Sequence, residues 1–167
     1  MIDWSAKVTP HFGWGEFVTG EAIDSRRRGL AASTGAQSGI KQLADVLEGL
    51  RMVLDAPIRI TSGYRGPTQT GSQHDTGHAV DIQVDGMKVL DLLGLVYGWS
   101  EQSPHPLRQV GAESLGRSLD VVMARGSGVW LHLAVRTGPW TRPSVKPWFT
   151  SVAPASGRRL YLDWSPA

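Results

Sequence analysis

Two separated stretches of the sequence hold side chains that could bind a metal ion. In the first, His74 and Asp81 flank a glycine at position 77. Their spacing is too long for one helical face at i, i+4. They converge if His74 lies on a loop, Gly77 lets the chain bend and Asp81 lies on the strand that follows. An imidazole nitrogen and a carboxylate oxygen together suit zinc.

The residues around Asp81, and those around a later histidine, alternate as half-buried strands do. Residues 79–84 alternate apolar and polar side chains, with Asp81 on the face opposite the apolar ones. Residues 129–135 alternate in the same way, with His132 opposite the leucines. If the two strands pair, His132 lies beside Asp81 on one polar face. Two histidines and one aspartate, with a fourth position left to water, match the ligand count of a catalytic zinc site.

These residues belong to motifs that occur in the same order in a known enzyme family. The motifs are His11-Phe12-x-x-x-Glu16-Phe17, Ser62-Gly63-Tyr64-Arg65, Ser72-x-His74-x-x-Gly77-x-Ala79-x-Asp81 and Trp130-x-His132. Over residues 11–136 the chain resembles the zinc D-Ala-D-Ala carboxypeptidase and L-alanyl-D-glutamate endopeptidase family, and its amino-terminal motif resembles that of phage and bacterial members.

The resemblance implies a Hedgehog-type α+β fold and a hydrolase that cuts the stem peptides of peptidoglycan. It implies a Zn²⁺ cofactor with His74, Asp81 and His132 as ligands. It also implies that Arg65 holds the substrate's carboxylate or polarises its carbonyl, because a guanidinium matches a carboxylate with two hydrogen bonds.

Three further residues are expected on the substrate side of the site. Tyr64 is expected to pack near Arg65. Ser72 is expected to orient the His74 loop by hydrogen bonding, as polar groups around zinc ligands commonly do. Trp130 either walls the cleft or belongs to the core.

The sequence departs from the family pattern at the general base. The family carries a carboxylate shortly before the last histidine, commonly three residues upstream, where this chain has Val129. The nearest acid upstream of His132 is Asp120, and Asp75 is another local candidate. Because loss of a general base costs roughly 10²–10⁴-fold in rate, this departure leaves two readings open.

The first reading is an active zinc peptidase, either a phage lysin or a virion-associated wall hydrolase. The second is a weak or inactive tail or baseplate protein that keeps the fold and the zinc site. The intact ligand set and Arg65 favour the first reading, and the missing base and the carboxy-terminal arm over residues 137–167 favour the second.

Periodicity predicts one domain, over residues 1–136, built as a small antiparallel sheet flanked by helices on one side. The strongest helix begins near Ile40 with Ser38 as its N-cap, after a linker over residues 29–38. The other predicted helices are 15–28 and 86–99, and the predicted strands are 58–61, 79–84, 115–124 and 129–135, with a polar connection over 100–112.

Residues 137–167 differ in composition from the rest, with five prolines and three tryptophans and no sustained period. They are expected to form an extended arm that lies on the domain or on a partner, such as another virion protein. Residues 159–164 could form one edge strand within it.

Composition excludes several other classes of protein. The 167-residue chain has no cysteine and a net charge of only +2, so thiolate zinc ligands are impossible and nucleic-acid binding is not expected. No apolar run reaches membrane-spanning length, and the amino terminus shows no secretory signal. We therefore expect a location in a phage virion, or in host cytoplasm with later release to the wall.

Overall fold

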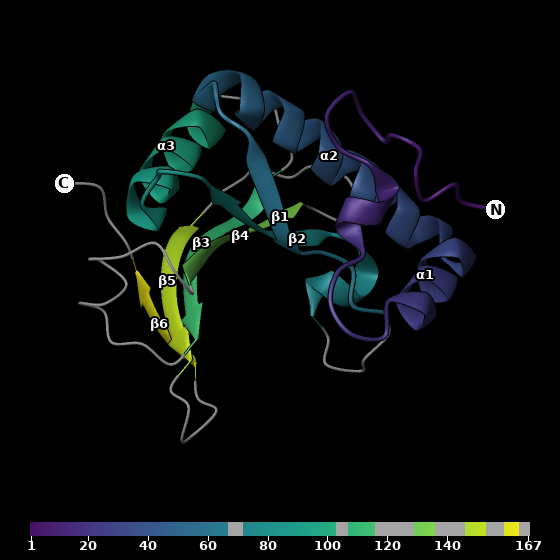
Figure 1. Ribbon diagram of the computed structural model, residues 1–167. Helices are drawn as coiled ribbons and strands as arrows, with labels where there is room; N and C mark the ends of the chain where they lie inside the picture. Colours follow the sequence, from purple (N-terminus) through teal and green to yellow (C-terminus); the bar gives the residue numbers. More distant parts are fainter. Residues whose placement is uncertain (67–71, 103–106, 116–128, 136–145, 153–158, 164–167) are drawn as a thin grey trace.

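The computed structural model describes residues 1–66, 72–102, 107–115, 129–135, 146–152 and 159–163. Its centre is a six-stranded sheet in the order β1-β2-β4-β3-β5-β6 (Figure 1). The first four strands in that order pair antiparallel, and β5 joins β3 in parallel. The strands are β1 Ile58–Ser62, β2 Ala79–Val84, β3 Leu107–Leu115, β4 Val129–Val135, β5 Lys146–Val152 and β6 Arg159–Asp163.

Two helices, α2 Thr34–Leu54 and α3 Val89–Gln102, form a second layer against the apolar face of this sheet, and α1 Ile23–Ala32 packs against α2 (Figure 1). Short 3₁₀ turns lie at η1 Trp14–Phe17 and η2 Gln73–Thr76. Leu47 of α2 and Leu93 of α3 are fully buried in one cluster with Ile82 and Leu131 of the sheet. The prediction of an α+β fold is confirmed. No helix in the described part of the chain has the length and apolar character needed to span a bilayer.

The amino-terminal helices differ from the predicted ones. The segment predicted as a linker is helical on both sides of Ser33, where α1 ends and α2 begins. The N-cap is therefore Ser33 and not Ser38, and its hydroxyl accepts a hydrogen bond from the Ala36 amide at 3.2 Å. Leu30 and Ala36 are buried at 0% and 2% exposure, so tertiary packing has overridden the low helix propensity of this stretch.

The helices predicted at 15–28 and 86–99 also have other limits. The first divides into η1 and α1, with a break between them, and the second begins at Val89. Gly86 lies in the turn between β2 and α3 at a φ of 78°. A residue with a side chain adopts such a positive φ only under strain.

One strand lies earlier in the chain than predicted. Residues 107–115, expected to fall mainly in a polar connection, form β3, which pairs antiparallel with β4. This pairing sets Gly111 opposite His132 and Glu113 opposite Trp130. Most of the strand predicted at 115–124 lies outside the described residues.

Two strands in the carboxy-terminal region continue the sheet. β5 pairs with β3, and β6 pairs antiparallel with β5 at the edge. The predicted edge strand at 159–164 is confirmed over residues 159–163. The rest of the predicted arm, with the residues expected to contact a partner, lies outside the described residues.

Candidate metal centre

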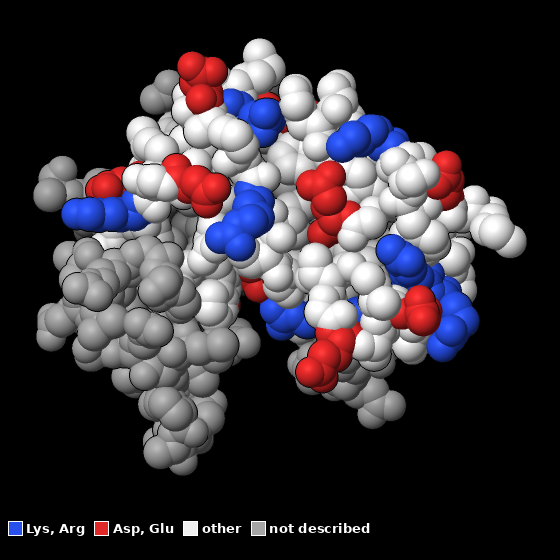
Figure 2. All heavy atoms as spheres, in the orientation of Figure 1, with Lys and Arg blue, Asp and Glu red and all other residues white. Residues whose placement is uncertain are grey.

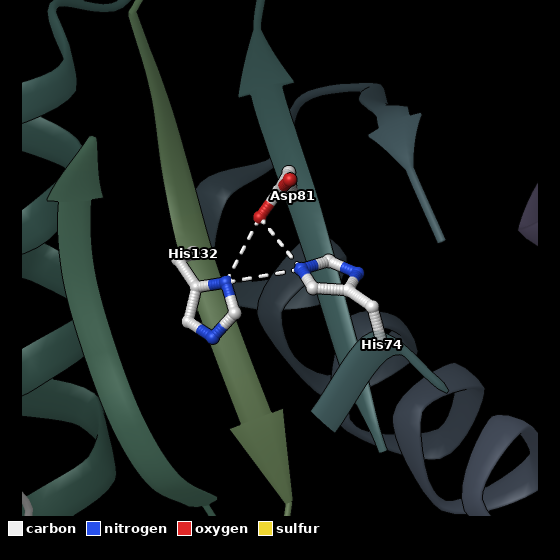
Figure 3. Close-up of side chains that lie close together, drawn as sticks. All are labelled: His74, Asp81 and His132. Atoms are coloured by element: carbon white, nitrogen blue, oxygen red, sulfur yellow. Dashed lines mark hydrogen bonds and ion pairs between the residues drawn. The ribbon is translucent and has the colours of Figure 1, made fainter. Parts of the chain in front are cut away.

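Three side chains from separate parts of the chain point toward one another on the face of the sheet away from the helices (Figure 3). His74 Nε2 lies 3.3 Å from Asp81 Oδ1 and 3.3 Å from His132 Nδ1. His132 Nδ1 lies 2.9 Å from the same carboxylate oxygen. Around a tetrahedral zinc with bonds of about 2.0–2.1 Å, ligand atoms stand about 3.3 Å apart. Two of the three separations match this value, the third is shorter, at 2.9 Å, and the N, N, O donor set suits zinc.

Strand register brings two of the three side chains together. Asp81 on β2 is directly opposite His132 on β4, so both side chains leave the sheet on the same face. The neighbouring pairs, Val80 with Leu133 and Ile82 with Leu131, send their side chains into the core. A slip of one residue would exchange the two faces, so burial of the apolar set fixes the polar pair.

The third side chain is positioned by a tight turn against α2. His74 lies in η2, whose N-cap Ser72 accepts a hydrogen bond from the His74 amide at 3.3 Å. Gly77 ends the turn at a φ of 73°. A Cβ on Gly77 would lie 2.5 Å from the Ala36 carbonyl oxygen, and one on Gly39 would lie 2.6 Å from that of Gly77. Both glycines are therefore needed for α2 to approach the turn this closely.

A second close contact sets the orientation of the His74 ring. His74 Nδ1 lies 2.8 Å from the Gly63 carbonyl oxygen. Since a carbonyl only accepts, Nδ1 carries the proton, and in the neutral ring Nε2 presents its lone pair to the cluster. Gly63 itself packs on η1, where an added Cβ would lie 2.3 Å from the Phe17 carbonyl oxygen.

The centre carries a buried negative charge that is well compensated. Asp81 is 2% exposed. Burial by itself raises the pKa of Asp81, but the close hydrogen-bond and charge interactions with the His132 and His74 rings, when those rings are protonated, outweigh it and hold that pKa below its usual range. Arg65 Nη2 contacts the other carboxylate oxygen at 2.9 Å. Asp81 is thus ionised, as a zinc ligand must be.

The structure places the other predicted site residues as follows. Arg65 lies at the centre, where its Nε also donates to the Ser62 hydroxyl at 3.1 Å. Ser72 supports the His74 turn, as expected. Tyr64 is only 3% exposed within the core, which leaves little of it for a substrate. Asp120 lies outside the described residues.

Trp130 is half-buried, and its indole leads to a residue that the sequence reasoning missed. Trp130 Nε1 donates to Glu113 Oε2 at 3.0 Å. Glu113, on β3, is 7% exposed. The available signal was an acid within 107–115 that alternates onto the polar face. No face was assigned to it from the sequence, because the predicted connection ends at residue 112 and the predicted strand begins only at residue 115.

A cavity of about 290 Å³ lies where β2 ends and β4 begins. Its lining includes Arg59, Gln83, Lys88 and Trp130. Gln83 and Trp130 each lie two residues from a member of the metal cluster on the same strand, so they share its face of the sheet. Asp85 and core residues such as Ile82 and Leu92 also line the cavity, and none of the three cluster residues does. The cavity therefore lies at the strand ends, one step along the sheet from the candidate metal centre, and carries two cationic side chains and one acidic one.

Charge on the visible face of the described residues is otherwise mixed. Acidic and basic side chains are interspersed in Figure 2, without a broad patch of one sign on the described part of that face.

Residues 17–97 match the sequence model of the Peptidase M15 family. The match supports the M15 family of zinc peptidases, and it includes His74 and Asp81 but ends before His132. No curated protein and no solved structure matches the chain. The third member of the cluster is therefore identified by the pairing of β2 with β4.

Proposed function

We propose that the protein is a zinc-dependent peptidase that hydrolyses the stem peptides of peptidoglycan. The observation that carries the proposal is the cluster of His74, Asp81 and His132, whose ligand atoms lie 2.9–3.3 Å from one another, close enough to share one zinc ion. The match to the M15 family over residues 17–97 supports the same reaction class.

The ligand atoms would be His74 Nε2, Asp81 Oδ1 and His132 Nδ1. Three protein ligands are the number found in catalytic zinc sites, whereas structural sites use four. A bound zinc ion supplies Lewis acidity for the scissile carbonyl and lowers the pKa of a water ligand from about 15.7 to about 7.

Arg65 is the residue we assign to the substrate. Its side chain is 35% exposed, although Asp81 and Ser62 hold it at the centre. An exposed guanidinium fixed in this way can receive a carboxylate or a carbonyl oxygen of a peptide next to the metal. The ion pair to Asp81 and a role in substrate binding are compatible, because guanidinium has five N–H donors.

The cavity at the ends of β2 and β4 offers two cationic side chains to an acidic peptide. Arg59 and Lys88 line it together with Asp85, and stem peptides carry free carboxylates that the two cations would attract. We place the substrate peptide so that the part on one side of its scissile bond runs along this cavity. The part on the other side of the bond then lies across Arg65.

The test is to incubate the zinc-loaded protein with purified peptidoglycan and to measure newly formed amino groups. We expect release that a chelator abolishes and added zinc restores. Mass spectrometry of the soluble fragments then identifies the bond that is cut. His74→Ala should lose both zinc and activity. His78→Ala is the matched control, because this nearby imidazole lies outside the cluster.

Two results would contradict the proposal in different ways. Stoichiometric zinc without amine release would leave a protein that keeps the metal for stability, as expected of an inactive structural component. Wild-type protein that binds no zinc would refute the metal centre itself.

A further inference from the structure

Glu113 occupies the same face of the sheet as the candidate metal centre. In the pairing of β3 with β4, Gly111 is opposite His132 and Glu113 is opposite Trp130. Directly opposed residues send their side chains to the same face, and so do residues two apart on one strand. Glu113 therefore lies on the face that carries His132, one step along the sheet from it.

The residue of β3 directly opposite His132 is a glycine. Gly111, opposite His132, is buried and places no side chain over the centre. Diagonal neighbours on adjacent strands stand roughly 7–8 Å apart, a span that a glutamate side chain and one water molecule can cover. Glycine within a strand often marks a place where a ligand approaches the backbone.

The Glu113 carboxyl group is held in a fixed orientation away from bulk water. It is 7% exposed, and burial of an acid is costly unless polar groups receive it. Trp130 Nε1 donates to its Oε2 at 3.0 Å. The indole is a donor only. This bond therefore orients one carboxylate oxygen, and the indole cannot take a proton from the carboxyl group.

The strand geometry also explains why no carboxylate stands three residues before His132, where the resemblance predicts the base. Val129 stands where the resemblance predicts a carboxylate, but its side chain is 2% exposed and belongs to the core on the helix-covered face. A base at Val129 would point away from His132. A carboxylate on β3 reaches the correct face from the neighbouring strand.

We infer that Glu113 is the general base of the hydrolysis, and that Trp130 is its positioning residue; this inference rests on the proposed function. Glu113 takes a proton from the attacking water as the water oxygen bonds to the carbonyl carbon. The proton then passes to the leaving nitrogen as the C–N bond breaks. The products are a carboxylic acid and an amine, and no further reactant is needed.

The test compares wild type with Glu113→Gln, which keeps the size of the side chain and an oxygen for the Trp130 bond. We expect hydrolysis to fall about 10²–10⁴-fold, with unchanged zinc stoichiometry, zinc affinity and thermal midpoint. Glu21→Gln is the matched control, because it removes one negative charge from an exposed residue and should hydrolyse at the wild-type rate.

A second readout does not depend on turnover. Acetohydroxamic acid would bind the zinc ion as acetohydroxamate, and its hydroxyl proton would pass to a carboxylate placed where the base acts on the water. Because a hydrogen bond to a charged group is lost, Glu113→Gln should weaken acetohydroxamate binding about 10–100-fold. Trp130→Phe should weaken it as well, by a smaller factor, with zinc affinity unchanged.

The outcomes separate this inference from the proposed function. If Glu113→Gln hydrolyses like wild type, Glu113 is not the base, although the protein is a peptidase. If wild type cleaves no stem peptide, the proposed function fails, and acetohydroxamate binding still decides whether Glu113 faces the metal ligand. Equal affinity in both proteins would overturn the inference.

Discussion

The two halves of the candidate centre are supported in different ways. His74 is held by a short turn whose Gly77 lies against the backbone of α2, and its ring contacts the carbonyl of Gly63, which in turn lies against the backbone of η1. His132 is held in the middle of a sheet by the register of β4 with two neighbours. A turn built on close approach has little tolerance for an added atom, whereas a register set by many pairs tolerates the loss of one.

The largest effect is expected when a metal-binding side chain itself is removed. His74→Ala and His132→Ala should each weaken zinc binding by more than about 100-fold, because changes to groups around the ligands already cost 10–100-fold. Metal content and competition with a chromophoric chelator measure the loss. A variant that still binds one zinc at wild-type affinity would remove that histidine from the centre.

The support of His132 is tested by truncating its apolar neighbour. Leu133→Ala, at a fully buried position, should lower the free energy of unfolding by about 2–5 kcal/mol. Zinc affinity of the folded protein should stay within a few fold, because the remaining pairs keep the register. Urea unfolding and zinc titration measure the two quantities. A large loss of affinity would show that the strand is no more tolerant than the turn.

The support of His74 is tested by adding a methyl group to the turn. Gly77→Ala should cost about 2–4 kcal/mol, since it combines left-handed backbone strain with a clash against Ala36. It should also weaken zinc binding, because the turn must move. Gly86→Ala is the control: its φ is equally positive at 78°, but an added Cβ would meet nothing within 4 Å. Equal costs for the two variants would rule out the close approach as the cause.

The smallest effect is expected from the protonation of Asp81, which contacts both His74 and His132. Its folded pKa is lowered, so it contributes stability above its unfolded pKa of about 3.9, and this contribution is lost as the pH falls below that value. In the metal-free protein, the stability difference between wild type and Asp81→Asn should therefore shrink from pH 7 to pH 3. A constant difference would contradict the assignment. The exposed Asp24→Asn serves as the control.

The metal cluster could be predicted from the sequence because the features that build it, two alternating strands and one glycine bend, are local in the chain. The alternation at 79–84 and 129–135 predicted both strands with their observed limits, and the Gly77 bend was also predicted. The opposition of Asp81 and His132 follows once the apolar residues of each strand must share one face. These features need only periodicity and one bend.

The features that were missed depend on contacts across the fold. Ser33 caps α2 because Leu30 and Ala36 are buried on either side of it, and composition alone favoured a linker there. β3 was missed because residues 100–112 include Pro104 and Pro106, which suggested a connection. Glu113 falls just after that connection and before the strand predicted at 115–124, so no face could be assigned to it until β3 was placed beside β4.

Arg65 joins the two halves of the centre. Its amide donates to the His74 carbonyl at 3.2 Å, while its guanidinium holds Asp81. A single residue thus braces a turn and a strand without the help of an ion. We expect a preorganised cage that survives chelation, so that cobalt or cadmium can be exchanged into the folded protein as spectroscopic reporters, without a cycle of denaturation.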